Sequence, residues 1–393
     1  MTDEKRTTRS KPALRFTRIQ LENWRNFVRI ETELQRRVLL VGPNASGKSN
    51  FLDVFRFLHD IVAVGGGLEE AARKRFGLSK LRSLAARNPS DVVIEVDLAS
   101  IDTTATWAYE LRLTQDKQHR PAIKRERVAK NGADLFVRPD ATDRSDPERL
   151  TQTYLQQVNV NREFRAIADF FGTIRYLHIV PQLVREPDRS VGRRNDPYGG
   201  DFLERVAATP ERTLRMRLRR ISRALHVAVP QLKELELSRD SRGTPHVRGR
   251  YEHWRPQGAW QTEEQFSDGT LRLLGLLWAV LDGHGPLLLE EPELSLHPDV
   301  VRHVPQMLAR MQRQTGRQII LSTHSTDMLT DEGIGLDEVL LLIPGAEGTD
   351  VRPAQAFGEV KALLDGGATL ADAVIPITRP RDAAQLMLFG EGA

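Results

Sequence analysis

Apolar positions near the start of the chain predict three short β-strands. Alternating apolar residues mark the first two as strands with one buried face: Leu14, Phe16, Ile19 and Leu21, then Phe27 and Ile30. The third run, residues 38–41, is wholly apolar, as expected for a central strand that is buried on both faces. Residues 1–12 are polar and charged, and we expect them to form a disordered tail.

A helical repeat of apolar residues follows the third strand, continues from Phe51 to Val62, and ends at the three glycines 65–67. Three later segments alternate apolar and polar side chains and predict an antiparallel sheet beside the main one: 91–98, 105–113 and 122–128. Residues 131–148 are mostly polar, and we expect them to form a loop.

The second half of the chain alternates predicted strands with predicted helices. Strands are expected at 174–180, 286–290, 317–322 and 339–343, and helices at 164–171, 201–227, 270–281 and near 360–364. A charged loop with Gly and Pro, residues 185–200, precedes the helices of 201–227. The sequence has no internal repeat and no heptad run long enough for a coiled coil.

The composition narrows this picture by exclusion. The chain has 393 residues, 40% hydrophobic and 28% charged, which fits one large α/β domain with insertions or two packed lobes. It contains no cysteine, so disulfides, cysteine nucleophiles, cysteine-ligated zinc and iron–sulfur clusters are excluded, and a cytoplasmic location is expected. The N-terminus has no apolar leader and the longest apolar run, 273–281, is too short to span a membrane, so we expect neither secretion nor membrane insertion.

The charge is informative mainly through its distribution. A net charge of +4 is too small to identify a nucleic-acid binder. Arginine outnumbers lysine by 47 to 10, a bias that a GC-rich genome explains without any function. The segment 205–223 nevertheless holds seven arginines against Glu211 and the preceding Glu204, and its arginines are candidates for phosphate contact: Arg205, Arg212, Arg215, Arg217, Arg219, Arg220 and Arg223.

The decisive motif lies between the third strand and the first helix. It reads Gly42-Pro43-Asn44-Ala45-Ser46-Gly47-Lys48-Ser49, the pattern of a phosphate-binding loop. The glycines let backbone N–H groups and the helix N-terminus face phosphates, while Lys48 neutralises phosphate oxygens and the Ser49 hydroxyl ligates magnesium. The alternative is a simple glycine turn, and the position between a buried strand and a helix favours a site for ATP and Mg²⁺.

A nucleotide held in this way needs a metal-bridging acid and a base for water at the end of a neighbouring apolar strand. Three leucines, 287–289, are followed directly by Glu290 and Glu291. We assign Glu290 to the magnesium ion and Glu291 to the attacking water. Two adjacent acids that cap a helix are the alternative interpretation.

A histidine follows another apolar strand. It is His324, in the run Ser322-Thr323-His324-Ser325, where its imidazole would donate to the γ-phosphate and hold the water. A helix-capping turn that contains an incidental histidine is the alternative.

A second anion-binding candidate opens the apolar helix 270–281. The motif is Ser267-Asp268-Gly269-Thr270, and Ser267 with the backbone N–H of Gly269 would bind a phosphate. Because the first site already has its own phosphate loop, this second one would take the ATP of a partner. A capped helix whose donors are hydrated is the alternative.

In this order the motifs resemble the ABC-type ATPase head of the SMC, RecF and OLD class, most closely its single-chain predicted AAA ATPases that lack a Toprim nuclease domain. The resemblance covers roughly half of the chain and starts at residues 16–27. It continues through the phosphate loop, the Ser-Asp-Gly-Thr signature, the strand end Glu290-Glu291-Pro292-Glu293, the D-loop Leu296-His297-Pro298 and the switch residue His324.

The resemblance implies an α/β fold of the P-loop NTPase type, an ABC-type head with a flanking antiparallel sheet and an inserted helical lobe. It implies a homodimer or higher oligomer that forms on ATP binding, with Ser267 and Gly269 of one head reaching the ATP that Lys48 and Ser49 of the other hold. A Q-loop glutamine would couple magnesium to the helical lobe. Gln182 is its best match and a ligand to the metal, although an ordinary polar loop residue is the alternative.

The opening segment adds two further candidates. Arg25 and Asn26 would approach the nucleotide from the edge strand, or would simply form an exposed β-turn. From the motifs we expect a tail at 1–12, an ATP-binding lobe with the antiparallel sheet at 13–180 and an arginine-rich helical insertion lobe at 181–262. The signature, Walker B strand, D-loop and switch would form a lobe at 263–345, and 346–393 would be a C-terminal extension.

Departures from the wider superfamily refine the expectation. The Ser-Asp-Gly-Thr signature argues against a transporter ATPase, and Glu290 stands where most ABC proteins have Asp. About 217 residues separate Ser49 from Ser267 without a coiled coil, which argues against long-armed SMC action. About 69 residues follow His324, too few for a Toprim domain, so a nuclease or effector would be a separate chain.

The function expected from the sequence is therefore ATP hydrolysis in DNA repair or anti-phage defence, with a separately encoded effector. Nucleic acid is a candidate partner and a membrane is not. The alternative is a non-hydrolysing scaffold in which ATP binding locks a protein assembly, and a transporter subunit ranks third.

Overall fold

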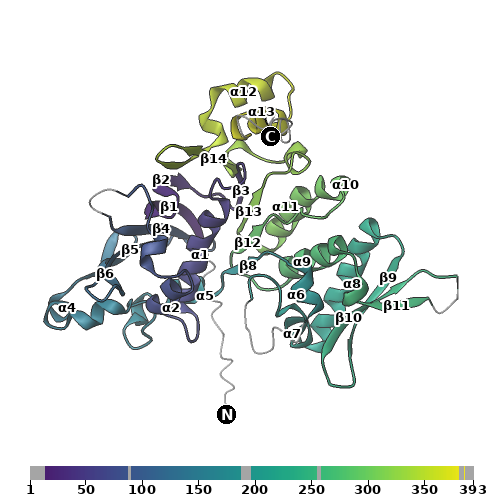
Figure 1. Cartoon of the computed structure of the whole chain (residues 1–393), viewed down its shortest axis with the longest axis horizontal. Helices are drawn as coiled ribbons and strands as arrows, with labels where there is room; N and C mark the ends of the chain where they lie inside the picture. The colour runs from purple at the N-terminus through teal and green to yellow at the C-terminus, as the bar shows by residue number, and fades with distance from the viewer. Residues whose placement is uncertain (1–13, 87–89, 187–195, 255–257, 380–384, 386–393) are drawn as a thin grey trace, which may run out of the picture. The chain divides into compact units, whose positions relative to one another are not determined.

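The structure is a computed structural model of the chain and describes residues 14–86, 90–186, 196–254, 258–379 and 385 (Figure 1). It divides into two compact units. The first comprises residues up to Gln35, Asp53–Ile174 and Pro344–Asp350, and the second comprises Arg36–Leu52, Arg175–Ile343 and Val351 onward. The tail predicted at 1–12 and much of the loop predicted at 185–200 lie outside the described residues. The five domain ranges taken from the motifs stay predictions.

The first unit is built on a six-stranded antiparallel sheet in the order β2-β1-β4-β5-β6-β7. Its strands are β1 (Leu14–Trp24), β2 (Phe27–Glu33), β4 (Val92–Ser100), β5 (Thr106–Gln115), β6 (Pro121–Lys130) and β7 (Ala133–Arg138). The predicted antiparallel sheet is confirmed, and the first two predicted strands belong to it. Alternating side chains along β4 and β5 are buried, which is the pattern from which these strands were predicted.

Aromatic side chains form the centre of the first unit. Phe16 on β1 lies 4.8 Å from Phe55 and 5.0 Å from Phe170, between ring centroids, and Phe171 packs against the same ring. The last two residues belong to α5 (Arg165–Gly172), which confirms the helix predicted at 164–171. Two shorter helices of the unit are α2 (Leu68–Arg73) and α3 (Leu78–Leu81).

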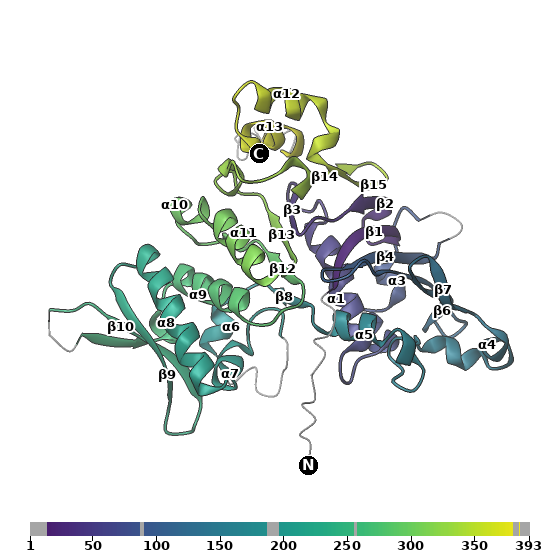
Figure 2. The same cartoon turned by 180° about the vertical axis from the view of Figure 1, so that it is seen from behind.

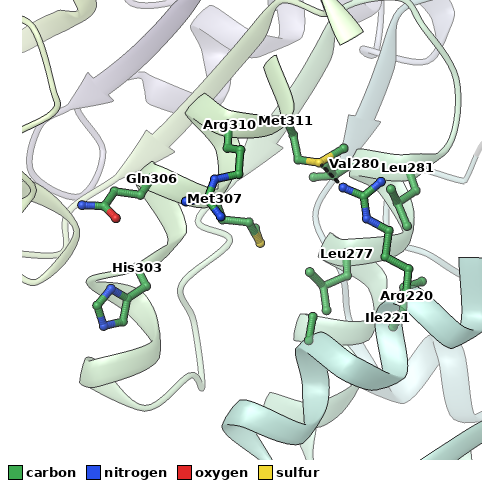
Figure 3. A pocket seen from close by; sticks show the side chains of 11 residues that line it. Arg220, Ile221, Leu277, Val280, Leu281, His303, Gln306, Met307, Arg310 and Met311 are labelled. Atoms are coloured by element: carbon green, nitrogen blue, oxygen red, sulfur yellow. Dashed lines mark hydrogen bonds between the residues drawn. The ribbon is translucent and has the colours of Figure 1, made fainter. Parts of the chain in front are cut away.

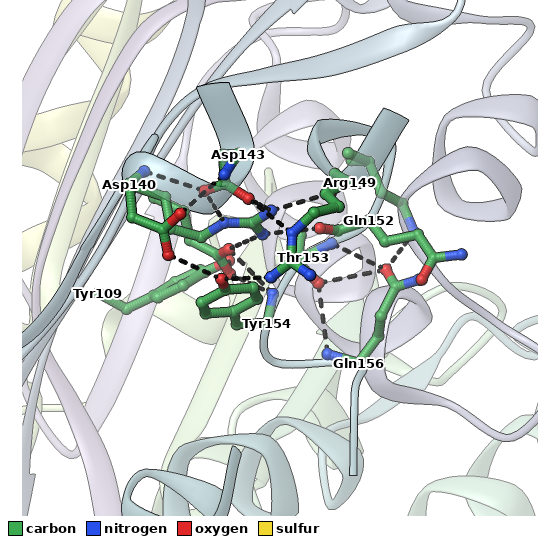
Figure 4. Close-up of polar contacts among 11 residues, drawn as sticks. Tyr109, Asp140, Asp143, Arg149, Gln152, Thr153, Tyr154 and Gln156 are labelled. Atoms are coloured by element: carbon green, nitrogen blue, oxygen red, sulfur yellow. Dashed lines mark hydrogen bonds and ion pairs between the residues drawn. The ribbon is translucent and has the colours of Figure 1, made fainter. Parts of the chain in front are cut away.

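The loop predicted at 131–148 is wrong, because this segment contains β7, helix α4 (Ala141–Ser145) and a short 3₁₀ turn at Pro147–Thr151. Two of its charged residues are buried as an ion pair, although most of its other polar residues are exposed. Arg138 and Asp143 are both fully buried, and the Arg138 guanidinium donates to the Asp143 carboxylate at 2.8 and 2.9 Å. Figure 4 shows Asp143 among the polar side chains that surround it, with Asp140, Arg149 and Tyr154 labelled. Arg138 also donates to Glu126 at 3.2 Å and lies 3.8 Å from the centroid of the Tyr154 ring. Charged residues that form buried hydrogen bonds with one another cannot be distinguished, from the sequence alone, from the hydrated charges of a loop.

The second unit is built on a six-stranded sheet in the order β15-β14-β3-β13-β12-β8, in which the neighbouring strands from β14 to β8 pair parallel. Its strands are β3 (Arg37–Val41), β8 (Arg175–Leu177), β12 (Leu287–Glu290), β13 (Ile319–Thr323), β14 (Val339–Gly345) and β15 (Gly348–Pro353). All five residues of β3 are buried, and β3 lies between β13 and β14, which confirms the central strand predicted at 38–41. The strand predicted at 174–180 is shorter than expected, because after Leu177 the N–H groups of His178 and Val180 donate to the carbonyl oxygens of Pro197 and Tyr198 and not to β12. Helix α6 (Pro181–Arg185) follows.

Helix α11 (Val304–Thr315) lies beside strands β12 and β13 in both views of the whole chain (Figures 1 and 2). The other helices that belong to this unit or begin in it are α1 (Lys48–Val62), α7 (Phe202–Ala207), α8 (Glu211–Ala228), α9 (Asp268–Leu281), α10 (Pro298–Val301), α12 (Gly358–Asp365) and α13 (Leu370–Thr378). The helices predicted at 201–227, at 270–281 and near 360–364 are confirmed. The chain passes between the two units within α1.

The insertion after α8 also contains a small sheet that the sequence did not predict. Strands β9 (Leu232–Arg239), β10 (Pro245–Tyr251) and β11 (Ala259–Thr262) pair antiparallel. Ion pairs connect the exposed positions of the first two strands, from Arg248 to Glu236 and from Arg250 to Glu234. Dense charges of both signs conceal the strand period, which explains why the sheet was missed. Within the described ranges, no helix has the length and apolar content needed to cross a membrane.

Candidate functional site

The phosphate loop lies between β3 and α1, as predicted. Ala45 and Gly47 have positive φ angles of 61° and 97°, which turn the backbone just before the helix begins at Lys48. A side chain has no room at Gly42, where a Cβ would lie 2.6 Å from Ser46 Oγ and 2.8 Å from the Leu342 carbonyl oxygen. The loop residues and Glu291 line a hollow of about 410 Å³, a size typical of small-ligand sites.

Lys48 is buried and folds back over the loop. Its Nζ donates to the carbonyl oxygens of Gly42 at 2.9 Å and of Pro43 at 3.0 Å. Burial lowers the pKa of the Lys48 ammonium, and the three carboxylates within residues 290–293 counteract this lowering. The loop therefore holds its cation beside a group of acids.

Glu290, at the end of β12, is held from two sides. The Ser49 hydroxyl donates to its Oε1, and the Tyr176 hydroxyl donates to its Oε2. Tyr176 reaches Glu290 because β8 and β12 are parallel neighbours in which Tyr176 pairs with Leu288. The contact between Ser49 and Glu290 brings together a hydroxyl and a carboxylate, which are oxygen ligands of the kind that Mg²⁺ prefers.

Sequence reasoning missed Tyr176 and His178, both of which contact Glu290. His178 Nδ1 lies 3.2 Å from the Glu290 backbone carbonyl oxygen. Only the parallel register of β8 and β12 reveals these contacts. The available signal was a tyrosine in a strand that was expected to be buried, since a buried hydroxyl needs a partner.

Glu291 is fixed through its backbone and faces His324. Its φ angle is 43°, and its N–H points to the Ser322 carbonyl oxygen at 3.1 Å and to Ser322 Oγ at 3.2 Å. Its Oε1 lies 3.2 Å from His324 Nδ1, and both side chains remain partly exposed, 22% for Glu291 and 46% for His324. The structure therefore brings together two residues that the sequence assigned to the same water molecule.

Glu293 is a third acid of the same strand end, and it is buried. Its Oε1 accepts hydrogen bonds from the Thr323 hydroxyl at 2.6 Å and from the His324 N–H at 3.4 Å. Within the described residues its Oε2 is buried without a hydrogen-bond partner, and burial raises the pKa of Glu293. Glu293 thus connects the end of β12 to the segment that carries His324, a role that the sequence alone did not indicate.

Ser267 caps helix α9, and Gly269 packs closely against the D-loop of the same chain. Ser267 Oγ accepts a hydrogen bond from the Thr270 N–H at 3.2 Å. A Cβ at Gly269 would lie 2.5 Å from the Ser295 carbonyl oxygen. Within one chain this is the geometry of a capped helix, and phosphate binding by these residues stays a prediction.

Three weaker candidates are placed as follows. Gln182 is exposed on α6, and its coupling role stays a prediction. Arg25 and Asn26 form the turn between β1 and β2, as the β-turn interpretation expected. In the first unit, Arg25 Nη2 donates to Asp53 Oδ2 at 3.0 Å, and the Asn26 side-chain amide donates to Thr349 Oγ1 at 2.7 Å.

Comparison with protein families agrees with this arrangement. Residues 38–330, about three quarters of the chain, match the family described as "AAA domain, putative AbiEii toxin, Type IV TA system". The chain belongs to this family. A comparison with curated proteins found no match.

Solved structures similar to this AAA protein are SMC head domains. One is an SMC head bound to the C-winged helix domain of ScpA, with 15% identity over 86% of this chain and 96% of that chain and a TM-score of 0.50. Another, derived from Pyrococcus furiosus, is an SMC head with an extended coiled coil bound to the C-terminal domain of ScpA. That structure shares 12% sequence identity with this chain. The match covers 90% of this chain and 99% of that chain, with a TM-score of 0.52. An SMC head domain from Thermotoga maritima shares 16% sequence identity with this chain. The match covers 86% of this chain and 98% of that chain, with a TM-score of 0.45.

At these identities the likeness shows the fold, and the fold is that of an ABC-type head of the P-loop NTPase class. The predicted fold class is therefore confirmed, and the predicted resemblance to an ABC-type head of the SMC class is confirmed at the level of the fold. This fold implies nucleotide binding, typically with Mg²⁺.

The residues present fit those two ligands. Among the described residues, no three His, Asp or Glu side chains converge to hold a metal on their own. Ser49 and Glu290 would instead hold a magnesium ion that takes its remaining ligands from phosphate oxygens and water, as is usual for this ion.

Proposed function

We propose that this AAA protein hydrolyses ATP and that hydrolysis controls a reversible dimer. The observation that carries the proposal is the position of Glu291. Its carboxylate lies against His324 and lines the same hollow as the phosphate loop, residues 44–50. A carboxylate beside a phosphate site can accept a proton from water as the water attacks.

Each residue of the site has a separate task in this proposal. Lys48 would exchange its two carbonyl partners for phosphate oxygens, and Ser49 and Glu290 would hold the metal. Glu291 would accept the proton of the attacking water, and His324 would orient that water and donate to the γ-phosphate. Bound magnesium would supply neutralisation of the phosphate charge. Gln182 would couple the metal site to the helical region.

The dimer is proposed from the start of helix α9. Its first backbone N–H groups have no acceptors within the helix, and the Ser267 hydroxyl is already oriented by Thr270. We propose that Ser267 and Gly269 of a second copy face the phosphates held by Lys48. ATP would then connect two copies, and its hydrolysis would release them.

A nucleic-acid trigger is proposed from the arginines of residues 205–223. Three of the seven arginines are committed to acids: Arg205 and Arg217 pair with Asp282, and Arg215 pairs with Glu211. Within the described residues the other four form no ion pair: Arg212, Arg219, Arg220 and Arg223. Exposed arginines on one helix are available for phosphate contact.

The biological setting we propose is DNA repair or anti-phage defence with a separately encoded effector. The family description includes a putative toxin of a type IV toxin–antitoxin system, which supports a defence role more than a metabolic one. A non-hydrolysing scaffold is the second candidate, because Lys48 and Ser49 would bind ATP without any turnover.

ATP hydrolysis by the purified protein, with and without double-stranded DNA, tests the main proposal. Lys48→Ala should abolish ATP binding and turnover. Glu291→Gln should retain ATP binding and lower turnover about 10²- to 10⁴-fold. Turnover that Glu291→Gln leaves unchanged would contradict the role of Glu291, and ATP binding without any turnover in the unaltered protein would favour the scaffold.

Salt-dependent DNA binding tests the trigger. Fluorescence anisotropy of labelled DNA should report binding that weakens steeply with salt, because released counterions drive phosphate contacts. Arg212→Ala with Arg219→Ala should weaken binding and reduce the salt slope. The exposed arginines Arg144 and Arg162 of the first unit provide a matched control pair. Absence of salt-sensitive binding with ATP present would rule out this trigger.

A further inference from the structure

A second hollow, of about 350 Å³, lies in the second unit and away from the phosphate loop (Figure 3). Three helices form its walls: α8, α9 and α11. Figure 3 shows the side chains of α11 on one side and those of α8 and α9 on the other. It shares no lining residue with the nucleotide site.

The floor of this groove is apolar and rich in methionine. It is formed by Ile221, Leu277, Leu281, Met307 and Met311. Met307 and Leu281 are half-buried, so part of the apolar surface stays open to solvent. Methionine side chains adapt to differently shaped apolar partners, and they are frequent on surfaces that bind amphipathic helices.

The rim of the groove is basic. Arg220 on α8 donates to Met311 Sδ at 3.0 Å and to Gln314 Oε1 at 3.4 Å, so it reaches across to α11 without contacting a carboxylate. Arg310 on α11 and His303, the residue before α11, are exposed. No acidic residue is among the residues that line the hollow.

The neighbouring sequence keeps this charge one-sided. Helix α11 contains two arginines and no acid, and α8 contains six arginines and a single glutamate, Glu211. The nearest acid in sequence to the groove floor, Asp282, is occupied by Arg205 and Arg217. The open apolar floor is therefore edged by cations that lack carboxylate partners within the described residues.

We propose that the groove of α8, α9 and α11 is the docking site for an amphipathic helix of a partner protein, with an apolar stripe flanked by Asp and Glu. The apolar stripe would lie on Leu277, Leu281 and Met307, and its acidic edges would face Arg220 and Arg310. Complementary charge gives such a complex its orientation and speeds association, while apolar burial provides the affinity. Identifying this partner with the separate effector rests on the proposed function.

Binding of designed peptides, measured without nucleotide, tests the groove. The probe is a fluorescein-labelled 18-residue helix with leucine at positions i, i+3, i+4 and i+7 and glutamate elsewhere. The comparison probe replaces each glutamate with lysine. The acidic probe should bind the full chain by fluorescence anisotropy at least tenfold more tightly than the lysine probe. Because no ATP is present, failure here leaves the proposed ATPase untouched.

Variants of the protein test whether the acidic probe binds in the groove. Arg220→Glu with Arg310→Glu should weaken binding of the acidic probe at least tenfold, whereas Arg144→Glu with Arg162→Glu, on exposed arginines of the first unit, should not. Met307→Asp should abolish binding while circular dichroism and the melting temperature stay unchanged.

Three outcomes would overturn the proposal. Equal binding of the acidic and lysine probes would show that the rim has no charge preference. A peptide of the chain's own residues 380–393 that displaces the probe would assign the groove to this chain. A self-associated state in sedimentation that Met307→Asp abolishes would assign it to a second copy.

Discussion

Glu291 Oε1 and His324 Nδ1 lie 3.2 Å apart, and the backbone N–H of each residue donates to a residue of the neighbouring segment. Glu291 is fixed by Ser322, and the His324 N–H is held by Glu293. The pair lies at the carboxyl ends of the parallel strands β12 and β13, where ligands of open α/β sheets bind. The carboxylate and the imidazole are thus positioned together before any nucleotide arrives.

Because the two side chains act on one water in the proposed mechanism, their effects should not add. Glu291→Gln and His324→Ala should each lower kcat about 10²- to 10⁴-fold, and the double variant should be little worse than the poorer single variant. Steady-state ATPase assays at saturating ATP measure this. Multiplicative losses would indicate that the two residues act in separate steps.

The Tyr176 hydroxyl should tune the affinity for magnesium. It donates to Glu290 Oε2, and such outer contacts typically change metal affinity about 10- to 100-fold when they are removed. Tyr176→Phe should therefore raise the magnesium concentration needed for half-maximal ATPase activity, with kcat at saturating magnesium nearly retained. Tyr251→Phe, in the small three-stranded sheet, is the matched control. An unchanged magnesium titration would contradict the role of Tyr176.

The sequence was most informative where the chemistry lies in consecutive residues. Residues 42–49 and the pair Glu290 and Glu291 each form one short segment, so their types and order were sufficient to predict the site. Tyr176 was missed because its contact with Glu290 depends on the pairing of two strands more than 100 residues apart in sequence. Strand register depends on the packing of the whole sheet, which local patterns do not contain.

The same limit explains the errors in the first unit. Residues 131–148 contain many charges, and the interpretation as a loop assumed that these charges are hydrated. Arg138 instead lies in a buried cluster with Glu126 and Asp143, and the Tyr154 N–H completes the cluster with hydrogen bonds to Glu126 at 2.9 and 3.1 Å. Partners from separate segments cannot be recognised from composition alone.

This cluster should make the protein sensitive to acid. Hydrogen bonds from Arg138 lower the pKa of Asp143 to about 2. A carboxyl group whose pKa is lower in the folded state stabilises the fold above its unfolded pKa, and this stabilisation is lost as the pH falls towards 2. The contribution at neutral pH is about 2 kcal/mol.

Asp143→Asn tests this contribution. At pH 7 the variant should be less stable by about 2 to 4 kcal/mol, since it leaves part of a buried ion pair without its charge. The difference in melting temperature between the variant and the unaltered protein should shrink steadily between pH 5 and pH 2. A difference that is independent of pH would show that Asp143 contributes through packing only. Asp134→Asn, at a more exposed ion pair with Arg127, is the control.

The contribution of His246 to the stability of the fold should have the opposite pH dependence to that of Asp143. Burial acts to lower the pKa of His246, but its hydrogen bond and charge contact with buried Glu263, at 2.6 Å, outweigh burial and raise that pKa. A histidine with a raised pKa stabilises the fold fully below its unfolded pKa of about 6.5, and the stabilisation is lost as the pH rises through the folded pKa. His246→Asn should therefore lower the melting temperature more at pH 6 than at pH 9. An equal loss at both values would contradict the ion pair.

Gly269 should be intolerant of a side chain for a reason that lies within one chain. A Cβ there would lie 2.5 Å from the Ser295 carbonyl oxygen, and a backbone oxygen cannot swing aside as a flexible side chain would. Gly269→Ala should therefore displace the D-loop and lower stability by about 1 to 3 kcal/mol. If Ser267 and Gly269 also face the ATP of a second copy, the variant should abolish the ATP-dependent dimer. Light scattering in a Glu291→Gln background measures that dimer.

Gly358→Ala is the matched control, because a Cβ at that first position of α12 meets nothing within 4 Å. It should leave both the melting temperature and the dimer unchanged. A Gly269→Ala variant that loses stability but still dimerises with ATP would separate the two roles. In that result the contact with Ser295 would be structural, and the proposed phosphate contact of the α9 N-terminus would be wrong.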